Sequence, residues 1–579
     1  MSLSSNVASD TPVKTNQLIP YAKSIKEYFS DKGYVFYIGI GLTTTVILTG
    51  VGLYFLRTPK PPKPRTRSTS RKKGPKTNKS TSSRTAREDA EAEEYERYTI
   101  DQINALPREK RVAASQLLKT RGNTVFGKGD YERGIKLYTQ ALAFNQDPIF
   151  YGNRAACYYN KNEFQKVIED CTNSLELDPY YVKALNRRAM AYENLSQYEE
   201  ALHDYTAACI INDYKNETSV RAIERLLRII ATNKAQEIMQ TRPKRLPSST
   251  MISLHLETFQ KMAFDATDTR PVISQEDKTG DDYFNDAQEF LSQQKYNDAM
   301  KAFDQAIELK CEHLDYAYNM RGTFAYLMGD FEGSLSYFEK ALELKPNYVQ
   351  VHIKRATVYT EQGKKLEECL DEFSKAIEID ENNPDIYYHR GQAIDDYQRR
   401  IELDPEFVYA YIQLVICQYK SKGIADAIKV CEDAIEKFND SAELYNYYGE
   451  LLVENGDINT AIEKFDKAIE FAKGKFVSPL IHRAMLVLHP NNNFTDAENY
   501  CQRALDIDPD NELAHLVMGE ILLSKNDCEG ALRYFEKYQE FPRTENELIG
   551  VQEYIEAAKS RIVFKKKYPQ VSERTFGKI

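Results

Sequence analysis

Five polar side chains in the first third of the chain could together bind a carboxylate. Lys119 and Asn123 are four residues apart, as are Lys183 and Arg187, so each pair lies on one face of an expected helix. Asn153 lies between the two pairs in the sequence. Two ammonium groups, one guanidinium and two amides suit carboxylates, above all a free C-terminal carboxylate beside an acidic side chain. These residue types predict a binding site for an acidic chain end.

Patterns typical of catalysis do not occur in the sequence. It contains no phosphate-binding loop, no nucleophile elbow, no zinc-protease motif and no dinucleotide-binding glycine pattern, and its eight His are scattered. Its nine Cys include no C-x-x-C pair. We therefore expect no catalytic residue, no metal site and no cofactor, and we interpret the protein as a non-enzyme.

A repeat of about 34 residues predicts the elements that position the five side chains. A glycine is followed by an alanine twelve residues on, an aromatic residue sixteen on and an alanine nineteen on, as in Gly449, Ala461, Phe465 and Ala468. This period is typical of the tetratricopeptide repeat, in which small residues let two antiparallel helices approach and the aromatic ring fills the space beside them. The sequence predicts an all-α tetratricopeptide-repeat superhelix of about eleven repeats, with one N-terminal transmembrane helix.

The repeats form two groups, and one repeat is short. Repeats one to three cover about 115–216, and repeats four to eleven cover 281 to about 542, followed by a last amphipathic helix over 544–566. The period is lost over 217–280, where two prolines within 242–249 predict a hinge. In the seventh repeat about ten residues are missing after Gly391. In repeats one to three, Asn153 shares its repeat position with Arg187, so the five polar side chains are expected to converge on one concave face.

The residues before the repeats predict a membrane anchor. Residues 34–56 form a run of 23 uncharged, mostly apolar residues, enough for a helix that crosses a hydrocarbon core of about 30 Å. Residues 57–87 then hold 12 Lys and Arg and no acidic residue, against 4 Lys in residues 1–33. By the positive-inside rule the basic flank and the repeats stay in the cytosol. The rest of the chain is acidic, which disfavours binding to nucleic acid.

The segments LKTRGN, FYGNRAACY and VKALNRRA resemble the carboxylate-clamp repeats that hold the EEVD tails of the seventy- and ninety-kilodalton heat-shock chaperones. The order of anchor, basic linker, three clamp repeats, break and eight further repeats resembles the seventy-kilodalton receptors of the mitochondrial outer-membrane protein translocase. That resemblance implies clamp roles for the five polar residues and a groove for precursor proteins, chiefly carriers, in the second group. It also implies contact with other translocase subunits and an anchor in the lipid bilayer of the mitochondrial outer membrane, with the N-terminus in the intermembrane space.

These inferences define the expected organisation. The segments are an intermembrane-space segment 1–33, a transmembrane helix 34–56, a basic linker 57–96, a clamp domain 97–240, a hinge or connector 241–280, and a precursor-binding domain 281–579. An alternative function is a membrane-anchored co-chaperone at another membrane, such as the endoplasmic reticulum. Both functions need the clamp, and they differ in the membrane and in what the second group binds.

Side chains at concave positions of the second group are expected to line the precursor groove. They are Tyr316, Asn319, Tyr388, Asn446 and Glu450. A wall of aromatic and polar groups in an acidic domain could accept apolar side chains, while its carboxylates suit basic segments of a precursor. The shortened seventh repeat leaves the shape of this groove open.

Overall fold

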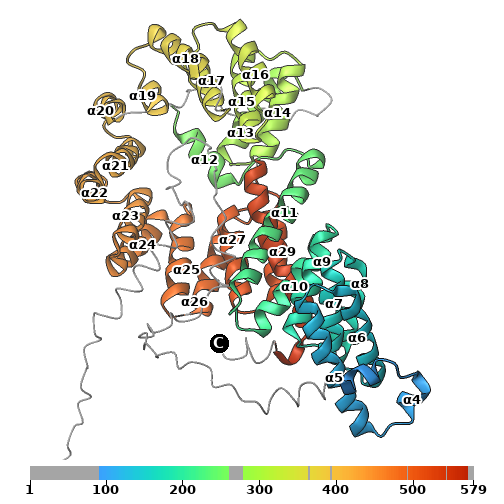
Figure 1. Cartoon of the computed structure of the whole chain (residues 1–579). Helices are drawn as coiled ribbons and strands as arrows, with labels where there is room; N and C mark the ends of the chain where they lie inside the picture. Colours follow the sequence, from blue (N-terminus) through green and yellow to red (C-terminus); the bar gives the residue numbers. More distant parts are fainter. Residues whose placement is uncertain are drawn as a thin grey trace, which may run out of the picture. The chain divides into compact units, whose positions relative to one another are not determined.

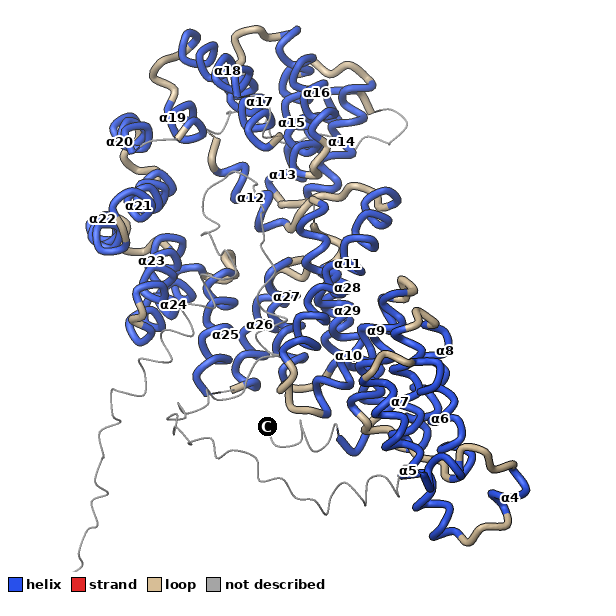
Figure 2. Tube along the Cα trace, viewed as in Figure 1, coloured by secondary structure: helices blue, strands red, loops and turns tan. Residues whose placement is uncertain are grey.

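The computed structural model describes residues 90–259, 278–362, 366–391, 394–491, 493–542 and 544–571. In this part of the chain the regular secondary structure is α-helix, and no strand occurs (Figure 2). The predicted segments 1–33 and 34–56, residues 57–89 of the predicted linker and residues 260–277 of the predicted connector lie outside it. No helix within the described ranges is both long enough and apolar enough to cross a bilayer.

Contacts between residues divide the described chain into two compact units. The N-terminal unit comprises the described residues up to Lys234 and those from Gln552 onward, and the C-terminal unit comprises Ala235–Val551. Both dividing points lie inside long helices, α11 and α29. The expected domains 97–240 and 281–579 remain predictions, but their boundaries differ from these units because the end of the last helix belongs with the first three repeats.

The N-terminal unit consists of three helix pairs, preceded by a short helix and followed by a long one (Figure 1). In chain order its helices are α4 Ile100–Asn104, α5 Arg108–Gly127, α6 Tyr131–Phe144, α7 Pro148–Asn160, α8 Phe164–Leu177, α9 Val182–Asn194, α10 Tyr198–Ile211 and α11 Glu217–Thr241. The first helix of each pair packs mainly against the second, and the second then packs against the next pair. This is the nearest-neighbour stacking of a repeat protein.

The C-terminal unit contains the other eight pairs, the helix α12 that precedes them and the first part of the long helix α29, whose residues from Gln552 onward belong to the N-terminal unit. Its helices are α12 Ser249–Glu257, α13 Gly280–Ser292, α14 Tyr296–Glu308, α15 Leu314–Leu327, α16 Phe331–Leu344, α17 Val349–Glu361, α18 Leu366–Ile379, α19 Pro384–Arg390, α20 Ile394–Leu403, α21 Val408–Lys422, α22 Ile424–Lys437, α23 Ala442–Asn455, α24 Ile458–Ala472, α25 Ser478–Asn491, α26 Phe494–Ile507, α27 Glu512–Ser524, α28 Cys528–Tyr538 and α29 Glu545–Lys567. Within the described residues the eleven pairs confirm the predicted all-α tetratricopeptide-repeat architecture in two groups.

Side-chain caps and prolines set the ends of many helices. Asp130 caps α6 by accepting a hydrogen bond from the backbone N–H of Arg133, and Ser441 caps α23 through the N–H of Leu444. Four second helices of pairs end two residues before a proline, which cannot continue a helix. They are α8, α16, α20 and α26, which precede Pro179, Pro346, Pro405 and Pro509.

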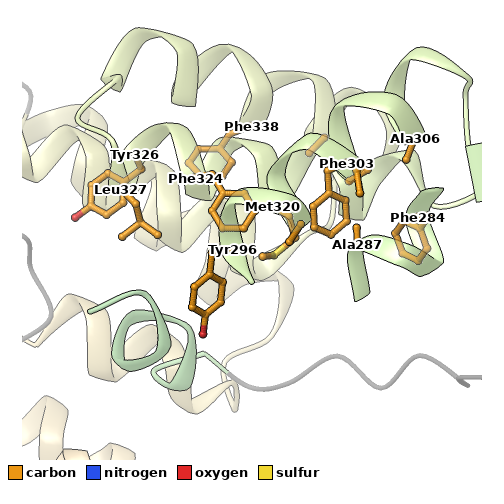
Figure 3. Packing of buried hydrophobic residues seen from close by; sticks show 14 of the residues in the cluster. Phe284, Ala287, Tyr296, Phe303, Ala306, Met320, Phe324, Tyr326, Leu327 and Phe338 are labelled. Carbon is orange, nitrogen blue, oxygen red and sulfur yellow. The ribbon is translucent and has the colours of Figure 1, made fainter. Parts of the chain in front are cut away.

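Close contact between a glycine and an aromatic ring joins the two helices of a pair. A Cβ atom on Gly322 would lie 2.5 Å from Cε1 of Phe338, so no larger residue fits without movement of the ring. Gly449 has the same relation to Phe465. Phe338 is 1% exposed and belongs to a continuous cluster of buried rings and small residues, which Figure 3 shows between the paired helices. Because the glycine lacks a side chain, the two backbones can approach closely.

The short seventh repeat keeps this contact. Its helices α19 and α20 have seven and ten residues, and a Cβ on Gly391 would collide with the ring of Tyr397. In a full-length repeat the glycine and the aromatic residue are sixteen positions apart, but here they are six apart. The deletion therefore shortens both helices at the end where they join and still leaves a packed pair.

The last helix closes the N-terminal unit. The side chains of Phe564 and Tyr568 are buried against the core of repeats two and three. The Ser560 hydroxyl donates to Thr206 Oγ1 over 2.9 Å, and Lys234 forms an ion pair with Glu556 at 3.0 Å. The second half of this helix therefore packs against the first repeat group.

Candidate functional site

The five polar residues predicted to bind a carboxylate lie on the first helices of repeats one, two and three. Lys119 and Asn123 lie on α5, Asn153 lies on α7, and Lys183 and Arg187 lie on α9. The side chains of Asn123 and Lys183 are exposed, and the other three are partly exposed. We call this set the N-terminal polar cluster. Its members occupy equivalent helices of a stacked array, which brings side chains far apart in sequence onto neighbouring positions.

Two amides of the cluster are in direct contact. Asn153 Nδ2 donates to Asn123 Oδ1 over 3.2 Å, and the Tyr138 hydroxyl donates to the same oxygen over 2.7 Å. On the same helix as Asn123, Lys119 Nζ donates to Gln116 Oε1 over 2.6 Å. The two asparagine side chains are thus held in fixed positions by neighbouring side chains.

The guanidinium group of Arg187, which lies in repeat three, contacts repeat two. Its Nη1 donates to the backbone carbonyl of Gly152, the residue before Asn153. Burial raises the pKa of the Cys157 thiol to about 12, and the charge of Arg187 opposes this rise. Arg187, Asn153 and Asn123 therefore lie along one row, whereas Lys183 is one turn from Arg187 and exposed. An anion along this row would meet amide and guanidinium donors.

The next residue on α9 has a different role. Arg188 is 7% exposed and pairs in a bidentate manner with Asp204, through Nε to Oδ2 at 2.6 Å and Nη2 to Oδ1 at 2.8 Å. Its Nη1 also donates to Thr172 Oγ1 over 3.0 Å. This arginine is fully engaged inside the unit and is not part of the N-terminal polar cluster.

The five residues predicted to line a precursor groove lie in three separate neighbourhoods of the C-terminal unit. Asn319 and Asn446 are each 1% exposed and Tyr388 is 4% exposed, while Tyr316 and Glu450 are partly buried. The structure brings Asn446 and Glu450 together and places the other three elsewhere. Their role in precursor binding stays a prediction.

Around Asn319 the structure contains a buried lysine. Lys354 Nζ donates to Asn319 Oδ1 and to Thr323 Oγ1, both at 2.9 Å, and lies 4.7 Å from the ring centroid of Phe259. Asn319 Nδ2 in turn donates to the Tyr348 hydroxyl over 3.1 Å. Burial lowers the pKa of Lys354 to about 7, and the charge of Asp385 opposes this shift. Lys354 therefore changes its charge near neutral pH.

Around Glu450 lies a second buried polar group. Asn446 Nδ2 donates to Glu450 Oε1 over 2.7 Å, and His482 Nδ1 lies 2.9 Å from Asn446 Oδ1. Burial raises the pKa of Glu450 to about 8, against the hydrogen bond from Asn446, and lowers the pKa of His482 to about 4. At pH 7 both groups are therefore mainly neutral, so the site carries little charge.

The two predicted tyrosines lie in aromatic clusters. The ring of Tyr316 packs edge-on against Phe284 with centroids 5.8 Å apart. The ring of Tyr388 packs edge-on against Phe407 at 5.3 Å and against His389 at 5.1 Å. Both rings thus contribute to packing within and between repeats.

Models of the tetratricopeptide repeat match several parts of the chain. The matched ranges are 148–181, 171–203, 315–348, 358–393, 413–475 and 491–544. They include the first helix of the short seventh repeat, α19, which falls within 358–393. Most of the matched segments coincide with one or more of the helix pairs described above.

Several relatives that match most of the chain are named TOM70. The mitochondrial import receptor subunit TOM70 of Rattus norvegicus is 26% identical over 493 residues, which cover 78% of this chain and 80% of the relative. The subunit of the same name from Saccharomyces cerevisiae is 27% identical over 497 residues. The crystal structure of yeast Tom70 matches 79% of this chain and 98% of its own, with 28% identity and a TM-score of 0.52. The chain is a tetratricopeptide-repeat homologue of TOM70. The family predicted from the sequence is confirmed, and the chain is a mitochondrial import receptor built from these repeats.

Two features of this TOM70 homologue escaped the sequence analysis. One is Lys354, a buried lysine in the segment VHIKRATVY, where the nearby His352 and Arg355 leave no sequence signal that distinguishes it. The other is the position of α12, whose short length and polar surroundings resemble an ordinary linker. Only the contacts of α12 with distant repeats give it a structural role.

Proposed function

We propose that the protein is a single-pass receptor of the mitochondrial outer membrane that docks cytosolic chaperones and receives hydrophobic precursor proteins. The homology to TOM70 supports the import role. In this proposal the N-terminal polar cluster binds the acidic EEVD tails of the seventy- and ninety-kilodalton heat-shock chaperones. The C-terminal unit accepts carrier precursors and passes them to other subunits of the translocase.

The observation that supports chaperone docking best is the row formed by Asn123, Asn153 and Arg187. The 3.2 Å contact between the two asparagines and the bond from Arg187 to the carbonyl of Gly152 bring three repeats to one place. Lys119 and Lys183 add two cations on the same helices. A C-terminal aspartate presents two carboxylates close together, and each could accept charge-assisted hydrogen bonds from these donors.

Two peptides that differ only at the chain end test this proposal. A labelled peptide ending in Glu-Glu-Val-Asp with a free carboxylate and its C-terminally amidated form are titrated with the protein by fluorescence anisotropy. A hydrogen bond to a charged group contributes about 1.5 to 3 kcal/mol, so amidation should weaken binding by roughly 10-fold to more than 100-fold. Equal affinity of the two peptides would contradict a carboxylate clamp.

A fusion of residues 1–87 to a fluorescent protein tests the membrane assignment. The uncharged run 34–56 and its basic flank motivate the expectation that the fusion labels mitochondria. Protease added to intact mitochondria should then remove the repeats from the full chain. Labelling of the endoplasmic reticulum instead would favour the co-chaperone alternative.

A further inference from the structure

The segment between the two repeat groups lies inside the C-terminal unit. We call residues 242–259 the connector segment; it includes α12. In Figure 1 the helix pairs α13 to α28 follow an arc, and α12 lies on the inner side of that arc. Arg242 Nη1 donates to the carbonyl of Gln539 over 2.8 Å, and Lys244 pairs with Asp330 at 2.7 Å. The segment thus contacts repeats far apart in the stack.

Hydrogen bonds connect α12 to three repeats that are not neighbours. The Ser253 hydroxyl lies 2.5 Å from that of Tyr296 in repeat four. The Tyr409 hydroxyl of repeat eight donates to Glu257 Oε2 over 3.0 Å. Thr250 Oγ1 donates to Asp508 Oδ2 over 2.6 Å, at the end of repeat ten.

Such contacts are unusual for an element of a repeat array. Each repeat in such an array contacts its neighbours, so an element that touches repeats four, eight and ten at once is bound in the way a ligand is bound. The connector segment is therefore an occupant of the inner surface and not a further layer of the stack.

Apolar side chains of the connector segment pack against two parts of the inner surface, repeats four to six and the later repeats, which we call its walls. Ile252 is 1% exposed and lies, with Leu256, in the buried cluster of repeats four to six. Leu254 packs against the cluster formed by the later repeats. At the end of the segment the ring of Phe259 stacks on His389 at 4.1 Å and covers the ammonium group of Lys354. The occupant is a short helix with apolar residues on two faces and an aromatic residue at its end.

Two ionisable side chains of the inner surface, Lys354 and Asp508, keep hydrogen-bond partners when the connector segment leaves. Lys354 retains Asn319 and Thr323, which belong to the repeats, and Asp508 retains Asn511 at 3.4 Å. Departure therefore leaves neither of these two charged groups without a protein partner, which would otherwise be costly. Departure ends the polar contacts of the segment, such as those of Thr250 and Glu257, together with its apolar contacts. An incoming apolar helix would restore the apolar part.

We propose that the connector segment is an internal occupant of the inner surface of the C-terminal unit and that a cargo segment displaces it. The cargo that fits is an apolar helical segment of a precursor, with side chains on two faces and an aromatic residue placed beside Lys354. This rests on the proposed function of the C-terminal unit. In the open state the connector segment has left the inner surface. Because only this state binds cargo, the measured affinity equals the affinity of the open state multiplied by the fraction of molecules that are open.

A double substitution in the full chain tests the displacement. Leu254→Ala with Phe259→Ala removes contacts to both walls, and Leu309→Ala serves as the control because that side chain is 49% exposed. The first probe is a labelled 20-residue apolar helical segment of a carrier protein. The second is a labelled peptide with the sequence of residues 246–262. If the parent is open one tenth of the time, the double variant should bind both probes about tenfold more tightly, and the control should bind them as the parent does.

Three outcomes separate this inference from the proposed function. Tighter binding of the 246–262 peptide alone supports an internal occupant and contradicts carrier binding at this surface. Unchanged or weaker binding of both probes, with helical content and thermal midpoint preserved, overturns the inference. If the double variant is unstable, hydrogen exchange of residues 250–257 in the parent decides. Saturation with the carrier probe should speed their exchange, and unchanged or slower exchange would overturn the displacement.

Discussion

Two adjacent arginines on α9 allow a sharp test of the N-terminal polar cluster. Arg187 is partly exposed and donates to the carbonyl of Gly152, whereas Arg188 is buried in a bidentate pair with Asp204. We expect Arg187→Ala to weaken binding of a free-acid Glu-Glu-Val-Asp peptide by roughly 10-fold to more than 100-fold, since bonds to a charged group contribute about 1.5 to 3 kcal/mol. Its effect on stability should stay small, because water can solvate the partly exposed site.

Arg188→Ala is the matched control. It leaves the carboxylate of Asp204 buried without its partner, and breaking such a pair costs about 3 to 5 kcal/mol. The variant should therefore lose thermal stability strongly, yet the fraction that remains folded should bind the peptide as the parent does. Calorimetry gives the affinities, and circular dichroism on heating gives the thermal midpoints. Parent-like affinity of Arg187→Ala, measured on folded protein, would refute the assignment of this residue to the cluster.

Further predictions concern packing, protonation and salt. Gly322→Ala should destabilise the protein by about 1 to 3 kcal/mol because the new methyl group meets Phe338. Gly127→Ala should be neutral or slightly stabilising, because no atom lies within 4 Å of the new carbon. Urea unfolding of the two variants compares these effects. Burial raises the pKa of Glu450 to about 8, so the folded state keeps a proton that the unfolded state releases. As pH rises from 5 to 7.5, the unfolding free energy of the parent should fall relative to that of Glu450→Gln, by at most about 1.4 kcal/mol per pH unit. Urea titrations measure both proteins. The difference between the parent and the control Glu463→Gln, whose site is exposed, should show no such trend. Raising salt should weaken capture of the chaperone peptide much more than capture of an apolar precursor segment, and equal salt dependence in anisotropy titrations would speak against two different binding modes.

The short seventh repeat shows how packing overrides sequence spacing. From the sequence, the loss of about ten residues after Gly391 left the shape of this repeat open. In the structure Tyr397 takes the place that an aromatic residue sixteen positions away occupies elsewhere. A deletion of nearly equal lengths from the facing ends of two antiparallel helices keeps the remaining residues in register. The contact with the glycine is therefore retained, although the period is not.

The groove residues show the limit of repeat position as a guide. The pattern placed Asn319 and Asn446 on the inward side of their helices, yet each is buried and hydrogen-bonded to a side chain of the next repeat. Their partners include Tyr348, which lies at the start of the next pair in the stack. Repeat position determines direction, but exposure depends on what the adjacent repeats and the connector place against it.

The sequence by itself determined the helix pairs, their two groups and the five polar residues of the N-terminal cluster. These depend on local spacing, because glycine, alanine and aromatic residues at fixed offsets bring two helices together, and prolines end them. Only the tertiary structure decided the place of the last helix, the burial of Lys354 and the position of the connector segment on the inner surface of the second group. These depend on contacts between residues far apart in the sequence, such as Thr250 with Asp508 and Lys354 with Phe259. Such contacts arise from the curvature that builds up along the stack, and no local pattern of residues encodes them.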